Sequence, residues 1–220
     1  MKFGILKVLF FVFFMSEFLQ GQSLINDEIL QKLKLFKADS SYFINALAYA
    51  SEDNFMKTNI YAPFGLKECY LHEDLRENLD KLAQILQEKR LKIVFYDCFR
   101  PNSAQKIAWQ KVSDERFVAN PYKSGSNHSR AIAVDVGLAN LKGEILPMPT
   151  SFDDFTARAR SDFACDENEK EKCQNRELLK EIMQKAGFKV IKTEWWHFEV
   201  DFKGLNKKQI KQKYPILDVK

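Results

Sequence analysis

The stretch "AIAVDVGLANLKGEI", Ala131 to Ile145, decides the fold of this 220-residue chain. Its first half is rich in β-branched and small apolar residues, which predicts a buried strand. Turn-forming residues follow from Asn140 to Gly143, and the chain then returns through a second segment. A strand that reverses over a short turn pairs with its neighbour in antiparallel fashion, so we expect an antiparallel sheet.

Helical and strand patterns alternate around this hairpin. Apolar periodicity or end signals predict helices over residues 71–88, over 102–112 with Asn102 as the cap, and over 175–188 with Gly187 past the end. Aromatic and β-branched runs predict strands over residues 91–99 and, in one or two pieces, over 189–202. The pattern indicates an α+β protein: a single domain with a mostly antiparallel central sheet flanked by helices.

Composition limits the possible functions. The chain is 45% hydrophobic, enough for one sizeable core, and contains no repeat or Pro/Gly/Ser-rich linker. Its net charge of +4 is too balanced to indicate a nucleic-acid partner. The basic run "KKQIKQK" near the C-terminus is expected to be a solvated helix face. Nothing in the sequence specifies an oligomeric state.

The N-terminal residues have the order of a secretory signal. Lys2 and Lys7 precede an apolar run from Val8 to Met15, and small and polar residues follow near Gly21 to Ser23. We expect residues 1–22 to be a signal peptide, residues 23–220 to be the single functional domain, and the mature chain to be periplasmic or secreted without stable membrane insertion. An uncleaved membrane anchor is the alternative, although the apolar run is short for a spanning helix.

Four cysteines are compatible with an exported protein, where disulfides persist. Three connectivities are possible. Cys165 and Cys173 flank a short polar loop that a local bridge would close, so we favour that pair, which leaves Cys69 with Cys98. A zinc-binding cysteine cluster is the alternative, but the C-x-x-C spacing typical of such clusters is absent.

Two of the three histidines lie in segments that suggest a metal site on the sheet. His128 and Asp135 fall in "SNHSRAIAVD", and His197 falls in "TEWWHFEV". Two imidazoles and one carboxylate are a donor set that zinc accepts in catalytic sites, with one position left for water. The third histidine, His72, is interpreted as a surface residue of the first helix rather than a ligand.

Glu194 is the candidate general base, because it lies three residues before His197. A carboxylate beside the water of a metal site can take up its proton. Residues three apart on a regular strand face opposite sides of the sheet. A bulge or strong twist near Trp195 is therefore expected to bring Glu194 to the side of His197.

These segments resemble a known family. "SNHSRAIAVD" and "EWWH" resemble the S-x-H-x-x-G-x-A-x-D and E-x-W-H motifs of zinc D,D-peptidases, and the chain is most similar to the VanX group of D-alanyl-D-alanine dipeptidases. Three further stretches resemble motifs of that group: "YASEDNF", "YDCFRP" and "MPTSFDDF". The five motifs stand in the family's order and extend from Tyr49 to His197.

The resemblance implies a role for each matched residue. One zinc ion per chain would be bound by His128, Asp135 and His197, with Glu194 as general base. Arg100 would stabilise an oxyanion or orient the substrate, while Ser126 and Asp153 would lie near the substrate, Asp153 meeting its free ammonium. The implied substrate is the D-Ala-D-Ala dipeptide or a peptidoglycan stem peptide.

Two positions depart from the family pattern. Ala131 stands where the family has glycine, and it would crowd the backbone if that position has a positive φ. Pro149 replaces the glycine of a Met-Gly-Thr stretch and removes an amide donor. Both changes concern substrate preference rather than the metal donors.

Two other functions remain open from the sequence. A D,D-carboxypeptidase on the same fold would trim the terminal D-Ala from muropeptide stems, and it requires an open groove beyond the substrate's amino end. A non-catalytic cell-wall-binding module with a zinc site would need neither Glu194 nor Arg100.

Overall fold

A computed structural model describes residues 24–219, so the expected signal peptide lies outside the described residues. The central sheet has five strands in the order β2-β4-β5-β7-β6, and a separate two-stranded sheet joins β1 to β3. The strand bounds are Leu35–Lys37 (β1), Phe43–Asn45 (β2), Tyr70–His72 (β3), Leu91–Asp97 (β4), Ala133–Asn140 (β5), Phe188–Val190 (β6) and His197–Val200 (β7).

The expected antiparallel sheet is confirmed, with one exception at its edge. The pairs β4–β5, β5–β7 and β6–β7 are antiparallel, whereas β2 runs parallel to β4. The hairpin that begins in β5 turns at Asn140 to Gly143 as expected, but its return consists of a single bridge between Ala139 and Ile145. Ile145 is exposed, so this return segment gains little from burial.

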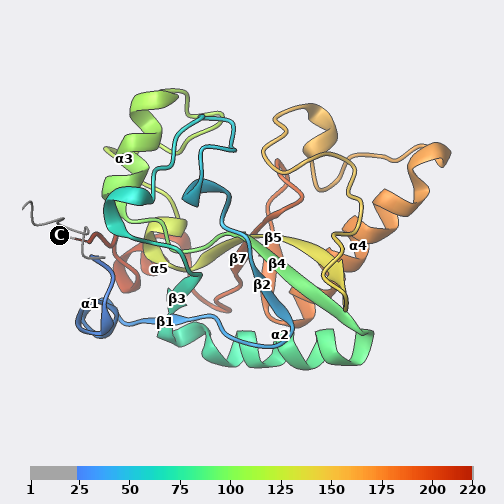
Figure 1. Cartoon of the computed structure of the whole chain (residues 1–220), viewed down its shortest axis with the longest axis horizontal. Coiled ribbons are helices and arrows are strands. Elements are labelled where there is room, and N and C mark those ends of the chain that lie inside the picture. Colours follow the sequence, from blue (N-terminus) through green and yellow to red (C-terminus); the bar gives the residue numbers. More distant parts are fainter. Residues whose placement is uncertain (1–23, 220) are drawn as a thin grey trace, which may run out of the picture.

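Helices lie on both sides of the sheet (Figure 1). Their bounds are Asp27–Lys32 (α1), Arg76–Lys89 (α2), Asn102–Lys111 (α3), Lys170–Lys185 (α4) and Lys207–Lys213 (α5). α2 and α4 contact each other and the sheet through buried leucine, isoleucine and methionine side chains. The expected solvated face of α5 is confirmed by its exposed lysines. Among residues 24–219, no helix has both the length and the apolar character needed to cross a bilayer.

The start of the first long helix was misplaced by the sequence pattern. Leu71 matches the leucine periodicity of α2, yet it lies in β3, because this segment pairs with β1, where Phe36 is the partner of Leu71. The interpretation of His72 as a surface helix residue is therefore wrong. Its side chain is only 12% exposed, accepts a hydrogen bond from the Asp74 N–H (3.2 Å) and packs edge-on against Tyr214.

The cap of α3 also differs from the expectation. Pro101 is the N-cap residue and Asn102 is already helical, so Asn102 does not cap its own helix. The carboxylate of Asp218 accepts from the N–H of Ser103 (2.9 Å) and from its hydroxyl (2.7 Å). The C-terminal segment therefore caps a helix whose first residues lie about half the chain away in sequence. A local sequence pattern cannot indicate such a distant partner.

Both disulfides of the described chain have the connectivity favoured from the sequence. Cys69 bonds to Cys98, and Cys165 bonds to Cys173. The four cysteines are therefore occupied, and the alternative of a zinc-binding cysteine cluster is excluded.

Candidate active site

Strand register brings two of the proposed donors together. Asp135 on β5 is the direct partner of His197 on β7, so their side chains lie on the same face of the sheet. The His197 Nδ1 atom lies 2.9 Å from Asp135 Oδ1. Antiparallel pairing thus joins two residues that are 62 positions apart in sequence.

The third donor comes from the short 3-10 turn His128–Arg130 that leads into β5. His128 Nε2 lies 3.3 Å from Asp135 Oδ1 and 3.1 Å from His197 Nδ1. The turn ends at Ala131, which has a φ of +56° and is fully buried. This is the left-handed conformation anticipated for the family's glycine, and here alanine adopts it.

The three side chains fit one divalent metal ion. Their donor atoms all lie within 4.8 Å of one another. Four-coordinate zinc with bonds of about 2.0–2.2 Å would separate its donors by roughly 3.3–3.5 Å, close to the distances found. Each ring is also held through its other nitrogen, His128 Nδ1 by the Cys98 carbonyl (2.9 Å) and His197 Nε2 by Glu199 (3.5 Å). Such outer contacts fix the orientation of metal-binding histidines.

A bulge aligns a further carboxylate with these donors. The register between β4 and β5 shifts between Phe95 and Asp97, so that Asp97 faces Asp135. We expected a bulge at Trp195, and the irregularity is instead in β4. Glu194 needs none, because it lies in the irregular segment before β7 begins at His197.

Asp97 and Arg100 form a buried ion pair beside the donors. Arg100 Nε donates to Asp97 Oδ2 (3.0 Å), Nη2 donates to the same oxygen, and Nη1 donates to Gln105 Oε1 (3.0 Å). The Tyr61 hydroxyl donates to the other oxygen of Asp97. A guanidinium has more N–H donors than these bonds use, so Arg100 can still reach a ligand in the cleft that it lines.

The cleft has a volume of about 360 Å³ and two walls of different origin. The "sheet wall" consists of Asp135 and His197 on β5 and β7, together with His128. The "loop wall" consists of Asp153 and Phe155 from the connection between β5 and α4, and of Glu194. Ser126 lies at the edge of the sheet wall, where its hydroxyl accepts from the His128 N–H (3.2 Å).

Burial dominates the electrostatics of the loop wall. Burial raises the pKa of Asp153 to about 8, assisted by the charge of Asp135, although the Tyr49 hydroxyl donates to both carboxylate oxygens (3.1 Å each). Burial also raises the pKa of Glu194, against the opposing effect of His197. Asp153 has a φ of +58°, in the left-handed region. Neither carboxylate has a salt-bridge partner among the described residues.

The sheet wall has the opposite character. Burial alone would raise the pKa of Asp135, but His128 and His197 hold it well below its usual range. Burial would lower the pKa of His197, yet its carboxylate neighbours, Asp135 first among them, raise it to about 10. The negative charge is therefore concentrated where the imidazole nitrogens converge, as a site for a cation requires.

Some site residues received no role from the sequence. Asp97 stands three residues before Arg100 in "YDCFRP", and Tyr49 opens "YASEDNF", but neither was assigned a function. Glu199 lies two residues after His197, and the two-residue period of a strand could have placed it on the same face. Pro149 is buried beside Thr150, whose hydroxyl accepts from Trp195 Nε1 (2.9 Å).

Convergent imidazole and carboxylate donors in a cleft, with the half-buried carboxylate of Glu194 lining the same cleft, define a metal-dependent hydrolase. Comparison with known proteins agrees with this class. The chain belongs to the M15 family of metallopeptidases, whose model, described as D-ala-D-ala dipeptidase, matches residues 39–215.

Relatives carry the same description. A D-alanyl-D-alanine dipeptidase of Escherichia coli (strain K12) is 38% identical over 154 residues, which cover 70% of this chain and 77% of the relative. A D-alanyl-D-alanine dipeptidase of Enterococcus faecium is 27% identical over 171 residues, covering 68% and 82%. A solved structure of a mutant D,D-pentapeptidase VanY in complex with Zn(II) aligns with a TM-score of 0.39 and 14% identity over 69% of this chain and 82% of that one.

Proposed function

We propose that this chain is an exported zinc-dependent D-alanyl-D-alanine dipeptidase acting in peptidoglycan metabolism. The convergence of His128, Asp135 and His197 on one point beside Glu194 carries the proposal. Family membership and the names of the relatives support the substrate.

The zinc ion would be held by His128 Nε2, Asp135 and His197 Nδ1. When bound, it supplies Lewis-acid polarisation of a carbonyl and lowers the pKa of a coordinated water. Asp135 contributes a full negative charge, because the neighbouring histidines keep its pKa low. The Cys98 carbonyl and Glu199 hold the two imidazoles in the orientation that directs these nitrogens at the ion.

Glu194 is the group that takes up and returns the proton. It lines the cleft and has no ion-pair partner within the described part of the chain, so its carboxylate is available to act as a base. The raised pKa brings a carboxylate closer to the working pH, which favours proton transfer in both directions. The proton taken by the Glu194 carboxylate is then available to the leaving amine.

The remaining residues orient the dipeptide. Arg100 is rigidly held by Asp97 and Gln105 and offers its free N–H groups to a carboxylate or a developing oxyanion. Ser126 contributes a hydroxyl at the same edge. Asp153 is the one carboxylate of the loop wall that faces Tyr49, and it would accept the substrate's ammonium.

The aromatic rings that narrow the cleft next to Asp153 support a preference for a dipeptide. The ring of Phe155 contacts those of Phe55 (5.0 Å between centroids) and Phe117 (4.7 Å), which narrows the cleft next to that carboxylate. A second cavity of about 300 Å³ shares Phe117, Phe155 and Glu194 with the first. If the rings of Phe117 and Phe155 moved apart, this second cavity would give room to a longer stem peptide. It therefore favours the second candidate function, a D,D-carboxypeptidase.

Export is supported by the two disulfides of the mature chain, because such bonds are rare in reducing compartments. The order of residues in the segment 1–22 supports it independently. Comparing the N-terminus of the secreted protein with that of the whole-cell precursor tests this part, and a chain retained in the cytoplasm would contradict it.

The activity is tested by D-alanine release from D-Ala-D-Ala and from a stem pentapeptide, with Glu194→Ala as control. We expect dipeptide cleavage that is lost on chelation, restored by zinc and absent in Glu194→Ala. Cleavage of the pentapeptide alone would favour the carboxypeptidase, and cleavage of neither would contradict both functions.

A further inference from the structure

The Cys69–Cys98 disulfide lies in the segment that contacts one of the proposed metal donors, His128. Cys98 immediately follows the last residue of β4, Cys69 immediately precedes β3, and each cysteine is 1% exposed. The bond has a Cα–Cα distance of 5.3 Å and a sequence separation of 29. It therefore ties the small β1–β3 sheet covalently to the end of a central strand of the five-stranded sheet.

The backbone next to this bond holds His128 at two points. The Cys98 carbonyl lies 2.9 Å from His128 Nδ1, and the Arg100 N–H donates to the His128 carbonyl (3.2 Å). The first contact directs Nε2 toward Asp135, and the second fixes the turn that carries the ring. A shift of residues 98–100 would therefore move a metal donor and Arg100 together.

β3 connects this segment to the other side of the His128 turn. The Phe99 N–H donates to the Tyr70 carbonyl (3.0 Å), and the His72 N–H donates to the Ala131 carbonyl (2.9 Å). The same short strand thus borders residue 99 and the residue that ends the turn. The disulfide sets the position of β3 relative to residues 98–100, and hence the space in which His128 lies.

Regular sheet or helix pairing does not hold these residues. β4 ends at Asp97, so residues 98–101 have no ladder partner, and residues 46–69 contain only two short 3-10 turns, Ala48–Ala50 and Ala62–Phe64. This loop carries Tyr49 and Tyr61, which contact Asp153 and Asp97. A covalent closure of such a loop removes conformations that single hydrogen bonds leave accessible.

We propose that the Cys69–Cys98 disulfide is a positioning element of the active site, which aligns His128 for metal binding and Arg100 for the substrate. In the family motif Asp-x-Tyr-Arg-Pro, Cys98 occupies the variable position between Asp97 and Phe99. The inference rests on the proposed function for the role of Arg100. Its effect on metal binding is independent of which peptide is cleaved.

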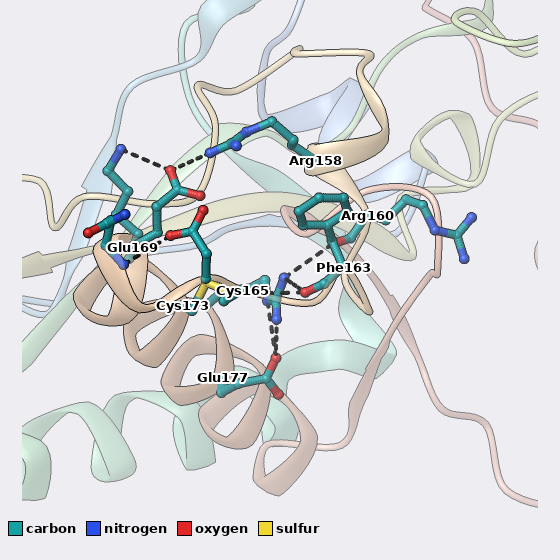
Figure 2. The surroundings of a disulfide bond; sticks show 11 residues. Arg158, Arg160, Phe163, Cys165, Glu169, Cys173 and Glu177 are labelled. Atoms are coloured by element: carbon teal, nitrogen blue, oxygen red, sulfur yellow. Dashed lines mark hydrogen bonds and ion pairs between the residues drawn. A yellow bond between two sulfur atoms is a disulfide. The ribbon is translucent and has the colours of Figure 1, made fainter.

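The second disulfide provides a matched control (Figure 2). Cys165 and Cys173 have a sequence separation of 8 and join the loop before α4 to its first turn, and Cys165 is exposed. The neighbouring loop is held independently of this bond, because Arg176 Nη1 donates to the Phe163 carbonyl (2.8 Å) and Arg158 pairs with Glu169. Figure 2 shows these contacts around the bond. Its removal should therefore leave the metal donors in place.

The experiment compares the double variants C69A/C98A and C165A/C173A with the native chain. Zinc affinity is measured by competition with a chromophoric chelator, kcat and KM are measured on D-Ala-D-Ala at saturating zinc, and hydrogen exchange of the Arg100 amide is measured in the metal-free chains. For C69A/C98A we expect zinc affinity to fall about ten-fold or more, as is typical when the outer contacts of a ligand are lost. We also expect kcat/KM to fall at saturating zinc and exchange at Arg100 to quicken.

The control variant should keep zinc affinity, kcat and KM within about two-fold. Native-like zinc affinity and Arg100 exchange in a folded C69A/C98A variant would overturn the proposal, whatever its melting temperature. If the native chain binds zinc but releases no D-alanine, the proposed function fails while the zinc and exchange measurements still decide this inference.

Should C69A/C98A fail to fold, the native protein can be reduced with a trialkylphosphine. Each disulfide becomes two thiols, and the phosphine becomes its oxide with oxygen from water. Thiol labelling and mass spectrometry then report which bond is open. Zinc loss that tracks the opening of Cys69–Cys98 in folded molecules supports the proposal. Retained zinc, or reduction of this bond only with global loss of the far-UV circular dichroism signal, would overturn it.

Discussion

The sheet wall and the loop wall of the cleft are built in different ways. On the sheet wall, register places Asp135 and His197 side by side, and a bulge sets the fully buried Asp97 next to Asp135. Each of these groups has a close polar partner. On the loop wall, Asp153 and Glu194 are half-buried and have no ion-pair partner among residues 24–219, and the pKa of each is raised. The sheet wall is suited to holding a cation, and the loop wall is suited to exchanging protons and charge with a substrate.

The largest effect is expected when a metal donor of the sheet wall is removed. Asp135→Ala removes the central donor of the sheet wall, so zinc should no longer bind stoichiometrically. D-alanine release should fall at least about a thousand-fold, since the metal contributes several kcal/mol to the transition state. Metal content by atomic absorption and a turnover assay check this, and a variant with native zinc content would contradict the assignment of Asp135.

The next effect concerns the loop wall alone. Glu194→Gln keeps the size of the side chain but cannot accept a proton, so kcat should fall by about 10²–10⁴. Zinc affinity should stay native-like, because Glu194 is not among the three convergent donors. Loss of zinc from Glu194→Gln, as expected for Asp135→Ala, would contradict the assignment of metal binding to the sheet wall and proton transfer to the loop wall.

A smaller effect is expected at Asp153. Asp153→Asn removes the charge proposed to meet the substrate's ammonium, so KM for D-Ala-D-Ala should rise about 10–100-fold, as expected for a lost charged hydrogen bond. The native enzyme should discriminate strongly against N-acetyl-D-Ala-D-Ala, and the variant should discriminate less. Tyr49→Phe, which removes only the phenol's hydrogen bonds to Asp153, serves as the milder control. Unchanged discrimination in Asp153→Asn would place the ammonium elsewhere.

The smallest expected effect is the pH dependence of stability that His72 on β3 contributes. Burial lowers the pKa of His72, although Asp74 opposes the shift, so protonation is easier in the unfolded chain than in the folded one. His72 therefore contributes full stability above its unfolded pKa of about 6.5, and this contribution is lost as the pH falls through the lower folded value. His72→Asn keeps an acceptor for the Asp74 N–H and does not titrate. The drop in melting temperature between pH 7 and pH 5 should be smaller in this variant, and an equal drop would contradict the account.

The sequence predicted the parts of the fold and site that depend on local pattern. The strand in Ala133–Asn140, the helix in Lys170–Lys185 and the candidate donors were all recognisable from nearby residues. The partnership of Asp135 with His197 was not, because it depends on register between strands distant in sequence. Neither was the bulge at Phe95–Asp97, which exists only relative to β5.

Two wrong expectations have the same cause. Leu71 continues the leucine spacing of α2, but antiparallel pairing with Phe36 of β1 makes that segment a strand. Asn102 has the composition of a helix cap, but Asp218 from the C-terminal segment takes the cap's place. In both cases a tertiary contact overrides a local preference, and the sequence near the site contains no sign of it.

The most direct test of the division between the walls is a zinc titration of the metal-free native chain beside Glu194→Gln, with bound zinc and D-alanine release measured on the same samples. We predict that both chains saturate at one zinc per chain, and that activity rises in parallel with occupancy in the native chain while remaining near background in Glu194→Gln. Activity in the metal-free native chain, or activity that requires a second equivalent of zinc, would contradict the account.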